Sequence, residues 1–438
     1  MVKRAAEFVR DLTFSHLDEA TVQSAKDCLL DFVGAALGGA GTRAGEISLK
    51  IGKTLGEGGR ATLWNTGEKI SCQGAAFIHG TMGSALDIDD GHRMAVGHPG
   101  GVVIPAAVAI AEEAQSSGRE LIEAIVCGYE VAIRSGNMHR LESSRFAEVA
   151  GSGRWGSIGA AASVAKLLRL EPEQTEQALA ISATFTPVAP VIDDLKRGFM
   201  PMSKFCSGWA GMVGICGTLL AKEGFTGISS TIDFSWSELP NFGESYEIKN
   251  TYFKPYPSCR WTHPALEGMM DLMKTHPDLG KDTIRRISVK IFSHGSHLGW
   301  KQPQTMESAQ YSIPFLIGAV VTDGVLTPGQ LTEDRLKDPD ILRVSDRVQV
   351  LHSPELDQYF PKAIPSEIEI ETISGKCYRT KVITPKGDPK NPMGAEEFTD
   401  KFRKLAIRSI RSRTAEKLIE DIRRLDQLET ITELFKHS

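Results

Sequence analysis

A cluster of ionisable side chains between residues 87 and 98 is the segment of this sequence best suited to chemistry. Three carboxylates, two imidazoles and one guanidinium fall within twelve positions, at Asp87, Asp89, Asp90, His92, Arg93 and His98. Apolar, small-residue segments flank the cluster on both sides, over residues 74–86 and 102–111. Charged groups between segments that are expected to be buried must either be satisfied locally or take part in chemistry.

The cluster could also serve to cap a helix or to bind a metal ion. A helix N-cap accounts for any one of the aspartates about as well as a chemical role does, because Asp is a preferred capping residue. One cap needs only one carboxylate, however, and the cluster has three. Asp and His are also metal ligands, although no other segment supplies an obvious further set of ligands. We therefore expect no metal at this site.

Two lysines elsewhere in the chain are candidates for binding a substrate carboxylate. Lys204 stands at the expected start of an apolar helix, where it could bind an anion or simply extend its side chain to solvent. Lys254 belongs to a turn fixed by two prolines, together with Cys259, Arg260 and His263. The turn lies where the composition of the chain changes, which favours a position in a cleft over a rigid linker with surface charges.

A glycine-containing stretch over residues 143–155 also carries charged side chains, at Arg145, Glu148 and Arg154. It is not a dinucleotide-binding fingerprint, because no strand precedes it and no acidic residue follows at the required distance. The chain also lacks a phosphate-binding P-loop and a G-x-S-x-G nucleophile elbow. Close packing of helices accounts better for these glycines.

Helices must position most of these candidate residues, because the first half of the chain is helical in its pattern. Apolar residues recur at helical spacing, and small residues are frequent where helices would pack closely. Pro172 suits the first turn of one of these helices. The expected helices span residues 20–37, 106–114, 121–138, 156–170, 171–183 and 208–223.

The pattern changes after residue 264. Period-two alternation predicts strands over residues 284–292, 341–351 and 366–373, and residues 376–382 are expected to pair with the last strand across a turn at Ser374-Gly375. Residues 308–323 and 327–336 are expected to form helices between these strands. Helices return over residues 396–405 and 415–434, and we expect them to dock on the first domain.

These patterns predict a mainly α protein with a smaller α/β (α+β) lid domain. Residues 1–263 and 393–438 are expected to form the large helical domain, and residues 264–392 the lid. A chain of 438 residues exceeds the size at which a single core keeps growing, which also favours two domains.

Composition and charge exclude several classes of partner. A net charge of −5 provides no basic surface for a phosphate backbone, so no nucleic-acid partner is expected. No apolar run reaches membrane-spanning length and no signal-peptide core is present, so no membrane partner is expected either. The seven cysteines form no C-x-x-C pair, which is typical of reduced thiols in a cytoplasmic protein.

Taken in order, several of these segments resemble the MmgE/PrpD family, which includes 2-methylcitrate dehydratase, cis-aconitate decarboxylase and iminodisuccinate epimerase. The resemblance rests on Asp87-Ile-Asp-Asp90, on His98-Pro-Gly, on Met-Ser-Lys204-Phe, and on Lys254-Pro-Tyr-Pro-Ser-Cys with Thr262-His263. It covers nearly the whole chain, including Ala309-Gln-Tyr-Ser-Ile-Pro-Phe. The individual motifs are degenerate, but their joint order is specific.

The resemblance implies a large all-helical domain built from both ends of the chain, a smaller lid, a homodimer, and no metal or organic cofactor. Carried over to this sequence, Asp87, His98, Lys204 and Lys254 match positions in the active-site crevice of the family. Its members share chemistry at a carbon next to a carboxylate. A base removes a proton, cationic side chains hold the carboxylates, and an acid returns the proton or assists the departure of water.

The chain departs from the dehydratase and decarboxylase patterns at four positions. Ala150 stands where many members have a histidine, and Gly91 stands where a threonine often follows the double aspartate. Phe315 matches the lid tyrosine of the decarboxylase, and Cys259 stands where that enzyme has a histidine. Because a histidine and a tyrosine are candidate acids, their loss points to a different substrate.

The roles of the missing histidine and tyrosine could be taken over by other residues, namely His92, Arg93, Cys259 and Tyr311. The full set of expected substrate-binding residues is Asp90, His92, Arg93, Cys259, Arg260, His263 and Tyr311.

The leading hypothesis is a cofactor-independent enzyme that removes a proton next to a carboxylate of a small di- or tricarboxylate, in a dehydration or a related elimination. His98 is the expected general base or acid, and Asp87 is expected to orient and tune it. Lys204 and Lys254 are expected to bind carboxylates and to stabilise the enolate-like charge.

Three alternatives stay open. An epimerase or isomerase of a dicarboxylate such as iminodisuccinate needs two proton-transfer groups and no leaving group, and the missing acids make it more attractive. A decarboxylase would release carbon dioxide. A carboxylate-binding protein without catalysis is a further hypothesis, for which Ala150, Gly91 and Phe315 are the motivating features.

Overall fold

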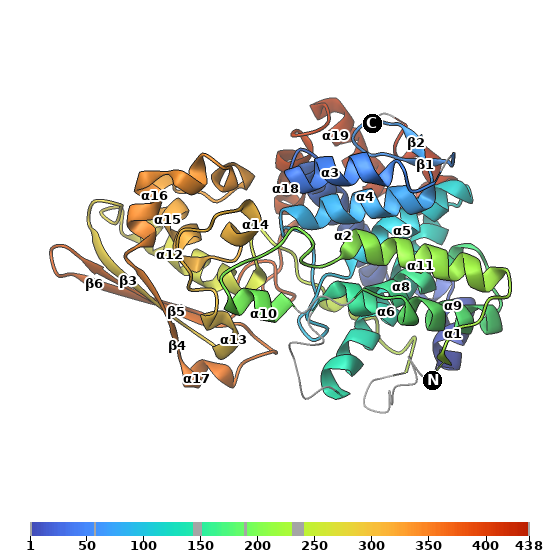
Figure 1. The fold of residues 1–438 in the computed structure, drawn as a ribbon, viewed down its shortest axis with the longest axis horizontal. Coiled ribbons are helices and arrows are strands. Elements are labelled where there is room, and N and C mark those ends of the chain that lie inside the picture. Colours follow the sequence, from blue (N-terminus) through green and yellow to red (C-terminus); the bar gives the residue numbers. More distant parts are fainter. Residues whose placement is uncertain (1, 57, 143–150, 188–190, 230–240, 437–438) are drawn as a thin grey trace.

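The protein consists of a large helical body and a smaller part that contains a sheet (Figure 1). The computed structural model describes residues 2–56, 58–142, 151–187, 191–229 and 241–436. The described residues form two large hydrophobic clusters, one in the helical body and one mainly in the smaller part. The molecule is therefore mainly α with a smaller α/β part, as the sequence predicts.

The helical body contains the helices that were expected between residues 20 and 223, with shifted boundaries. Two two-residue strands, β1 (Ala61–Thr62) and β2 (Lys69–Ile70), form a small hairpin beside these helices. The described helices of this part of the chain are α1 (Val2–Asp11), α2 (Glu19–Gly39), α3 (Arg43–Gly52), α4 (Cys72–Ala85), α5 (Gly100–Glu113), α6 (Gly118–Glu142), α8 (Ser152–Leu167), α9 (Pro172–Thr184), α10 (Val191–Lys196) and α11 (Ser207–Lys222).

Small residues let the central helices approach one another closely. Helix α5 is buried on every face from Gly100 to Glu112, as expected for an apolar helix at the centre of a body. A Cβ on Gly159 of α8 would lie 2.4 Å from the Cβ of Ala132 on α6, so only glycine fits there. Among the described helices, none combines the length and apolarity needed to cross a membrane.

The last two helices, α18 (Ala395–Ala406) and α19 (Ser412–Arg423), return to the helical body and lie beside α2 (Figure 1). Phe402 of α18 packs so closely against α2 that a Cβ on Gly34 would lie 3.0 Å from its ring. Lys401 of α18 donates a 2.5 Å hydrogen bond to Asp31 of α2, and both side chains are buried. The two ends of the chain therefore share one core.

A four-stranded sheet forms the framework of the smaller part, with the order β4-β3-β5-β6. Strands β3 and β4 are parallel, whereas β5 runs antiparallel to both β3 and β6. The strands are β3 (Ile284–Ile291), β4 (Val348–His352), β5 (Ser366–Thr372) and β6 (Cys377–Val382), and the helices are α12 (His263–Thr275), α13 (Ser293–Ser296), α14 (Met306–Ala309), α15 (Ile313–Asp323), α16 (Pro339–Ser345) and α17 (Pro354–Asp357).

The predicted alternation of β5 is confirmed, because every second residue from Ser366 to Thr372 is buried. Helix α12 packs directly on this sheet, where a Cβ on Gly268 would lie 2.4 Å from Ile368. The predicted hairpin is also confirmed, since β5 and β6 pair on either side of Ser374-Gly375.

The prediction of one strand over residues 341–351 is wrong. Its first half belongs to α16 and only its second half forms β4. Pro339 occupies the first turn of α16, and the Asp338 carboxylate caps it by accepting hydrogen bonds from the N–H groups of Asp340 and Ile341 at 2.9 and 3.2 Å. This cap outweighs the alternating pattern of the sequence.

Three predicted helices are shorter than expected. Residues 308–323 are divided between α14 and α15, because Ser312 caps a new helix with its hydroxyl on the N–H of Phe315 at 3.2 Å. Residues 327–336 form only 3₁₀ turns, at Pro328–Leu331 and Arg335–Lys337. The last helix ends at Arg423 and is followed by 3₁₀ turns at Leu425–Gln427 and Ile431–Glu433.

Candidate active site

The ionisable cluster lies on the loop between α4 and α5, and backbone pairs fix the shape of this loop. Gly91 exchanges two backbone hydrogen bonds with Tyr252, at 3.0 and 2.8 Å, and His92 pairs with Gly97 in the same way. Asp87, just after the end of α4, has a φ of 49°, in the left-handed region that favours glycine. A non-glycine residue in this region is strained, and such strain is frequent at functional sites.

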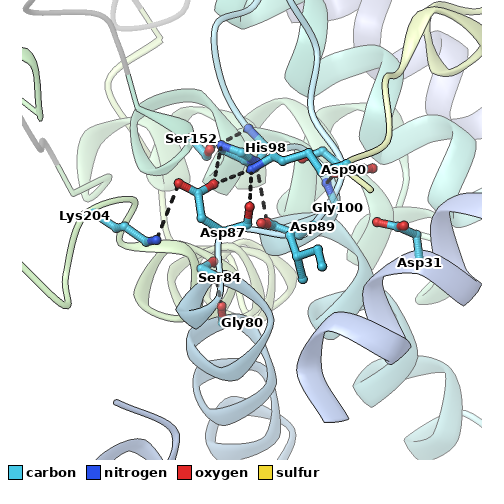
Figure 2. A network of polar contacts seen from close by, with 12 residues as sticks. Asp31, Gly80, Ser84, Asp87, Asp89, Asp90, His98, Gly100, Ser152 and Lys204 are labelled. Carbon is cyan, nitrogen blue, oxygen red and sulfur yellow. Dashed lines mark hydrogen bonds and ion pairs between the residues drawn. The ribbon is translucent and has the colours of Figure 1, made fainter. Parts of the chain in front are cut away.

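Asp87 is the centre of a buried cluster of opposite charges (Figure 2). Lys254 forms an ion pair with its carboxylate and donates a second hydrogen bond to its backbone carbonyl at 2.9 Å. Lys204 lies 3.6 Å from the other carboxylate oxygen. Burial alone would raise the pKa of Asp87, but the charges of the two lysines outweigh it and hold the pKa well below its usual value.

Gln310 fixes the position of Lys204 within this cluster. Its side-chain carbonyl accepts a hydrogen bond from the lysine ammonium group, and its amide donates to the carbonyl of Ala85 at 2.8 Å. The backbone carbonyl of Gln310 also accepts a hydrogen bond from the N–H of Cys259 at 2.9 Å. One glutamine of the smaller part therefore ties together three segments that carry candidate residues.

A backbone carbonyl orients the imidazole of His98, whereas the sequence predicts that Asp87 does so. The Nδ1 atom of His98 lies 2.6 Å from the carbonyl oxygen of Asp90, but Nε2 lies 3.9 Å from Asp87 Oδ1, beyond hydrogen-bond distance. A carbonyl can only accept, so Nδ1 carries the proton and Nε2 offers a lone pair. Burial, followed by the charge of Lys254, lowers the pKa of His98 to about 3, and the ring is therefore neutral.

Asp89 and Asp90 both lie next to His98, and their carboxylates differ in the hydrogen bonds that they accept. Asp90 accepts hydrogen bonds from the N–H of Gly100 at 3.0 Å and from the hydroxyl of Tyr129 at 2.5 Å. Asp89 receives no hydrogen bond from any described residue, although one of its oxygens lies 3.6 Å from His98 Nδ1. Burial raises the pKa of Asp89 to about 8 and that of Asp90 to about 7.

Asp87, Asp89 and His98 are also the described residues that could together hold a metal ion. One ligand atom from each lies within 4.8 Å of the others. However, two ammonium groups already compensate the charge of Asp87, and a divalent cation would have to be bound beside both of them. The charges of the cluster therefore favour lysine pairing over metal binding.

A cavity of about 710 Å³, including its mouth, opens beside Asp87 and His98, where the helical body meets the smaller part. Its lining combines a few ionisable side chains with many apolar ones. The lining residues are Asp87, His92, Arg93, Val96, Gly97, His98, Gly151, Val191, Leu195, Phe205, Tyr252, Cys259, Arg260, Trp261, Tyr311, Phe360, Pro361 and Ile364.

The lysines expected to bind carboxylates, Lys204 and Lys254, lie outside this lining, and so do two of the other predicted substrate-binding residues. The carboxylate of Asp90 is used to hold Gly100 and Tyr129, as in a helix cap. The ring of His263 is buried and its Nε2 lies 3.2 Å from the carbonyl of Ser258. The same motif therefore supplies both cavity residues and residues that support the fold.

The other predicted binding residues line the cavity, but both arginines already have partners. Arg93 forms an ion pair with Asp388, and the guanidinium of Arg260 donates to the carbonyls of Lys386 and Pro385 at 2.7 and 3.0 Å. His92 accepts the N–H of Ala95 at 3.3 Å and has its Nε2 3.3 Å from Glu247.

Cys259 and Tyr311 bring neutral groups to the cavity. Burial raises the pKa of Cys259 to about 12, so its thiol stays protonated. The hydroxyl of Tyr311 is buried near Asp87, and burial together with the charge of that carboxylate raises its pKa well above the usual value. The ring of Tyr311 lies 5.4 Å from the Lys204 ammonium.

Two of the departures from the family pattern have a structural counterpart. A Cβ on Gly91 would lie 2.3 Å from the hydroxyl oxygen of Tyr252, so the tyrosine occupies the space of a side chain at position 91. Phe315 is fully buried in the core of the smaller part and does not line the cavity, whereas the nearby Tyr311 does. Ala150, Arg145 and Glu148 lie outside the described residues.

Sequence reasoning missed two residues of the site, Tyr252 and Gln310, and assigned no role to a third, Asp89. Asp89 was visible as part of the aspartate cluster, but its lack of a partner was not. Tyr252 and Gln310 stand close to residues that were singled out, Lys254 and Tyr311, yet nothing in the sequence indicates that they reach Gly91 and Lys204.

Comparisons with known proteins agree with this architecture. Residues 3–248 match the family model of the MmgE/PrpD N-terminal domain, and residues 256–427 match that of the MmgE/PrpD C-terminal domain. The cis-aconitate decarboxylase-like protein oryM of Aspergillus oryzae is 25% identical over 98% of this chain and 95% of its own length. The human cis-aconitate decarboxylase is 25% identical over 97% of this chain and 91% of its own length. The Aspergillus terreus enzyme of the same name is also 25% identical, over 97% of this chain and 93% of its own length. With both of its domains matched along almost its whole length, the chain belongs to the MmgE/PrpD family.

Proposed function

We propose that this chain is a cofactor-independent lyase, dehydratase-like, that acts on a small di- or tricarboxylate by removing the proton next to a carboxylate. The observation that carries this proposal is the neutral His98, whose Nε2 lone pair lies at the cavity beside the cluster of Asp87, Lys204 and Lys254. A base next to buried cations is what the removal of such a proton requires.

His98 acts as the general base through Nε2, while Nδ1–H stays on the carbonyl of Asp90. A pKa of about 3 keeps the ring in its basic form, but it also makes a free imidazole a weak base. The charges of Lys254 and Lys204 contribute to this low value. A substrate carboxylate bound to the lysines would offset their charges, so the basicity of His98 rises as substrate binds.

Lys204 and Lys254 hold the substrate carboxylate and stabilise the negative charge that develops when the proton leaves. Neither ammonium group lines the cavity, so an incoming carboxylate reaches them by displacing Asp87, their partner that does line it. Lys204 is the looser partner of Asp87, at 3.6 Å, and is therefore the one recruited first. Buried cations that are already in place stabilise such charge without reorganisation of solvent.

The acid that protonates a departing hydroxide, or returns a proton to carbon, comes from the tyrosines of the cavity. Tyr311 and Tyr252 both line it, and burial raises both pKa values, so both hydroxyls keep their proton. Tyr311 is the stronger candidate because its ring lies 5.4 Å from the ammonium group of Lys204, whereas the ring of Tyr252 lies beside Arg260.

Two other reactions use the same arrangement. Decarboxylation is favoured by the names of the curated relatives, although their identity to this chain is only 25%. Epimerisation or isomerisation of a dicarboxylate such as iminodisuccinate is favoured by the presence of two kinds of proton-transfer group, imidazole and phenol, at one cavity. A carboxylate-binding protein without catalysis is the alternative outside enzymes.

Incubation in deuterated water with citrate, 2-methylcitrate, cis-aconitate and iminodisuccinate distinguishes these reactions. A new alkene absorbance from a hydroxy acid supports the dehydratase, and release of carbon dioxide from cis-aconitate supports the decarboxylase. Deuterium in recovered substrate with inverted configuration supports the epimerase. Ligand-induced thermal stabilisation without any turnover supports the binding protein.

Variants at the proposed base and cation test the assignment of roles. His98→Gln is expected to reduce turnover by about 10²–10⁴-fold, the usual contribution of a general base. Lys204→Ala is expected to reduce turnover by losing the charge that stabilises the intermediate. His352→Gln, a substitution of an exposed histidine, is the matched control. Turnover that survives both His98→Gln and Lys204→Ala would contradict the proposal.

We also propose a homodimer. Large apolar side chains are exposed on α11 and on segments that adjoin it in the sequence, which supports an interface there: Phe199, Met202, Trp209, Leu220, Phe225 and Ile228. Light scattering of the purified protein measures the mass directly, and Trp209→Glu is expected to shift it toward the monomer. A monomeric wild-type protein would contradict the dimer.

A further inference from the structure

One part of the cavity lining is apolar and continuous with the core of the smaller part. We call it the apolar wall, and it consists of Val191, Leu195, Phe205, Trp261, Phe360 and Ile364. All six side chains belong to one hydrophobic cluster or pack against it. Trp261 and Phe360 are partly exposed and meet edge to face, with ring centroids 5.9 Å apart.

The apolar wall begins next to the proposed base. The ring of Phe205 lies 4.3 Å from the ring of His98, and Phe205 directly follows Lys204 in the chain. A molecule whose reacting carbon lies at His98 and whose carboxylate lies at Lys204 therefore has its remaining substituents close to Phe205.

Both cavity arginines are engaged by one loop of the chain, which limits the number of carboxylates that the cavity can hold. Arg93 is paired with the buried carboxylate of Asp388, and Arg260 donates to the carbonyls of Pro385 and Lys386. The nearest other described cations are Lys204 and Lys254, which do not line the cavity themselves but pair with Asp87, a residue that does.

A tricarboxylate would therefore have to place at least one carboxylate against the apolar wall or break an existing arginine pair. An unpaired carboxylate in apolar surroundings is strongly unfavourable. An alkyl or aryl group in the same place loses water-exposed apolar surface and gains affinity, by about fourfold for each buried methylene.

We infer that the substrate is a mono- or dicarboxylate that carries an alkyl or aryl arm next to its reacting carbon, and that the apolar wall binds this arm. The inference rests on the proposed function, because that function places the carboxylate at the lysines and the reacting carbon at His98. It narrows the substrate class and makes Phe360 and Trp261 specificity-determining residues.

Calorimetric titration with a series of acids tests the inference on the wild-type protein. The probes are succinate, methylsuccinate, butylsuccinate, benzylsuccinate and propane-1,2,3-tricarboxylate, at one pH and ionic strength. Affinity is expected to rise along the succinates by about fourfold per methylene, and benzylsuccinate is expected to bind at least about tenfold more tightly than the tricarboxylate.

Substitutions in the apolar wall distinguish the binding of the arm from the binding of the carboxylate. Phe360→Ala is expected to reduce the affinity for benzylsuccinate by about tenfold and to leave that for succinate unchanged. Phe360→Leu, which keeps more of the packing, is expected to show a smaller loss of the same kind. Ile373→Ala is the matched control, since Ile373 is 67% exposed and does not line the cavity.

The outcomes distinguish the inference from the function on which it rests. If succinate binds but affinity does not rise along the series, or if the tricarboxylate binds most tightly, the inference of an apolar arm would be overturned. The proposed function would stay intact. Failure of all five acids to bind would contradict the proposed carboxylate chemistry, and the inference with it.

Discussion

Asp87 and Asp90 stand three positions apart on one loop, both without exposed surface, and yet their environments are opposite. The charge of Asp87 is compensated by two lysines from distant segments, and the residue lines the cavity. Asp90 is satisfied by a backbone N–H and a tyrosine hydroxyl and does not line the cavity. Lysine charges lower the pKa of Asp87, whereas burial raises that of Asp90 to about 7. The partners of an aspartate, and not its place in a motif, separate the reacting site from its support.

The largest expected effect comes from neutralising each aspartate in turn. Asp87→Asn leaves two buried ammonium groups without a counter-charge, and removing one partner of such a pair costs about 3–5 kcal/mol. Asp90→Asn keeps an oxygen for the N–H of Gly100, and its cost is expected to be about 1 kcal/mol or less. Urea unfolding of the two variants and the wild type measures both values. Equal losses would show that the two aspartates do not differ in the way described.

The two tyrosines beside these aspartates extend the comparison to a smaller effect. The hydroxyl of Tyr129 bonds Asp90, whereas that of Tyr311 is buried near Asp87 in a residue that lines the cavity. Tyr129→Phe is expected to cost about 1–3 kcal/mol of unfolding free energy, because a buried acceptor loses its donor, and to change turnover little. Tyr311→Phe is expected to leave stability unchanged and to reduce turnover by about tenfold or more. The reverse pattern would move the proposed acid away from Tyr311.

The smallest effect is a dependence of stability on pH that Asp89 introduces. Its pKa of about 8 in the folded protein exceeds its usual value, so the folded state binds the proton more tightly than the unfolded chain does. The stabilisation is therefore fully present below about pH 4 and is lost as the pH rises through 8. Asp89→Asn does not titrate, and its advantage over the wild type is expected to grow by at least about 1 kcal/mol between pH 5 and 9. Parallel unfolding curves for the two proteins across this range would contradict an unpartnered Asp89.

Much of the fold follows from the sequence because a buried face imposes a regular spacing of apolar residues along a helix or a strand. Helix α5 and strand β5 were predicted from apolar and alternating residues, and both are present. The strand predicted over residues 341–351 is wrong because a local cap at Asp338, with Pro339, decides for helix. A cap of one or two residues can therefore override the pattern of a whole segment.

The central residues of the candidate site were predictable, but their roles and several of their neighbours were not. Asp87, His98, Lys204 and Lys254 meet at one place, as the resemblance to the MmgE/PrpD family implied. The orientation of His98 depends on a backbone carbonyl, which every residue has, so no sequence pattern marks it. The approach of Tyr252 to Gly91 depends on how two distant segments pack, and the sequence shows only that position 91 is small.

A crystal structure of the protein with bound succinate tests most directly the central claim, that His98 acts as a base on a carboxylate held by buried lysines. The expected result is a carboxylate oxygen about 2.7–3.2 Å from Nζ of Lys204 or Lys254, with a methylene carbon about 3.5 Å from Nε2 of His98. Succinate bound at Arg93 and Arg260, with its carbons out of reach of His98, would contradict the claim.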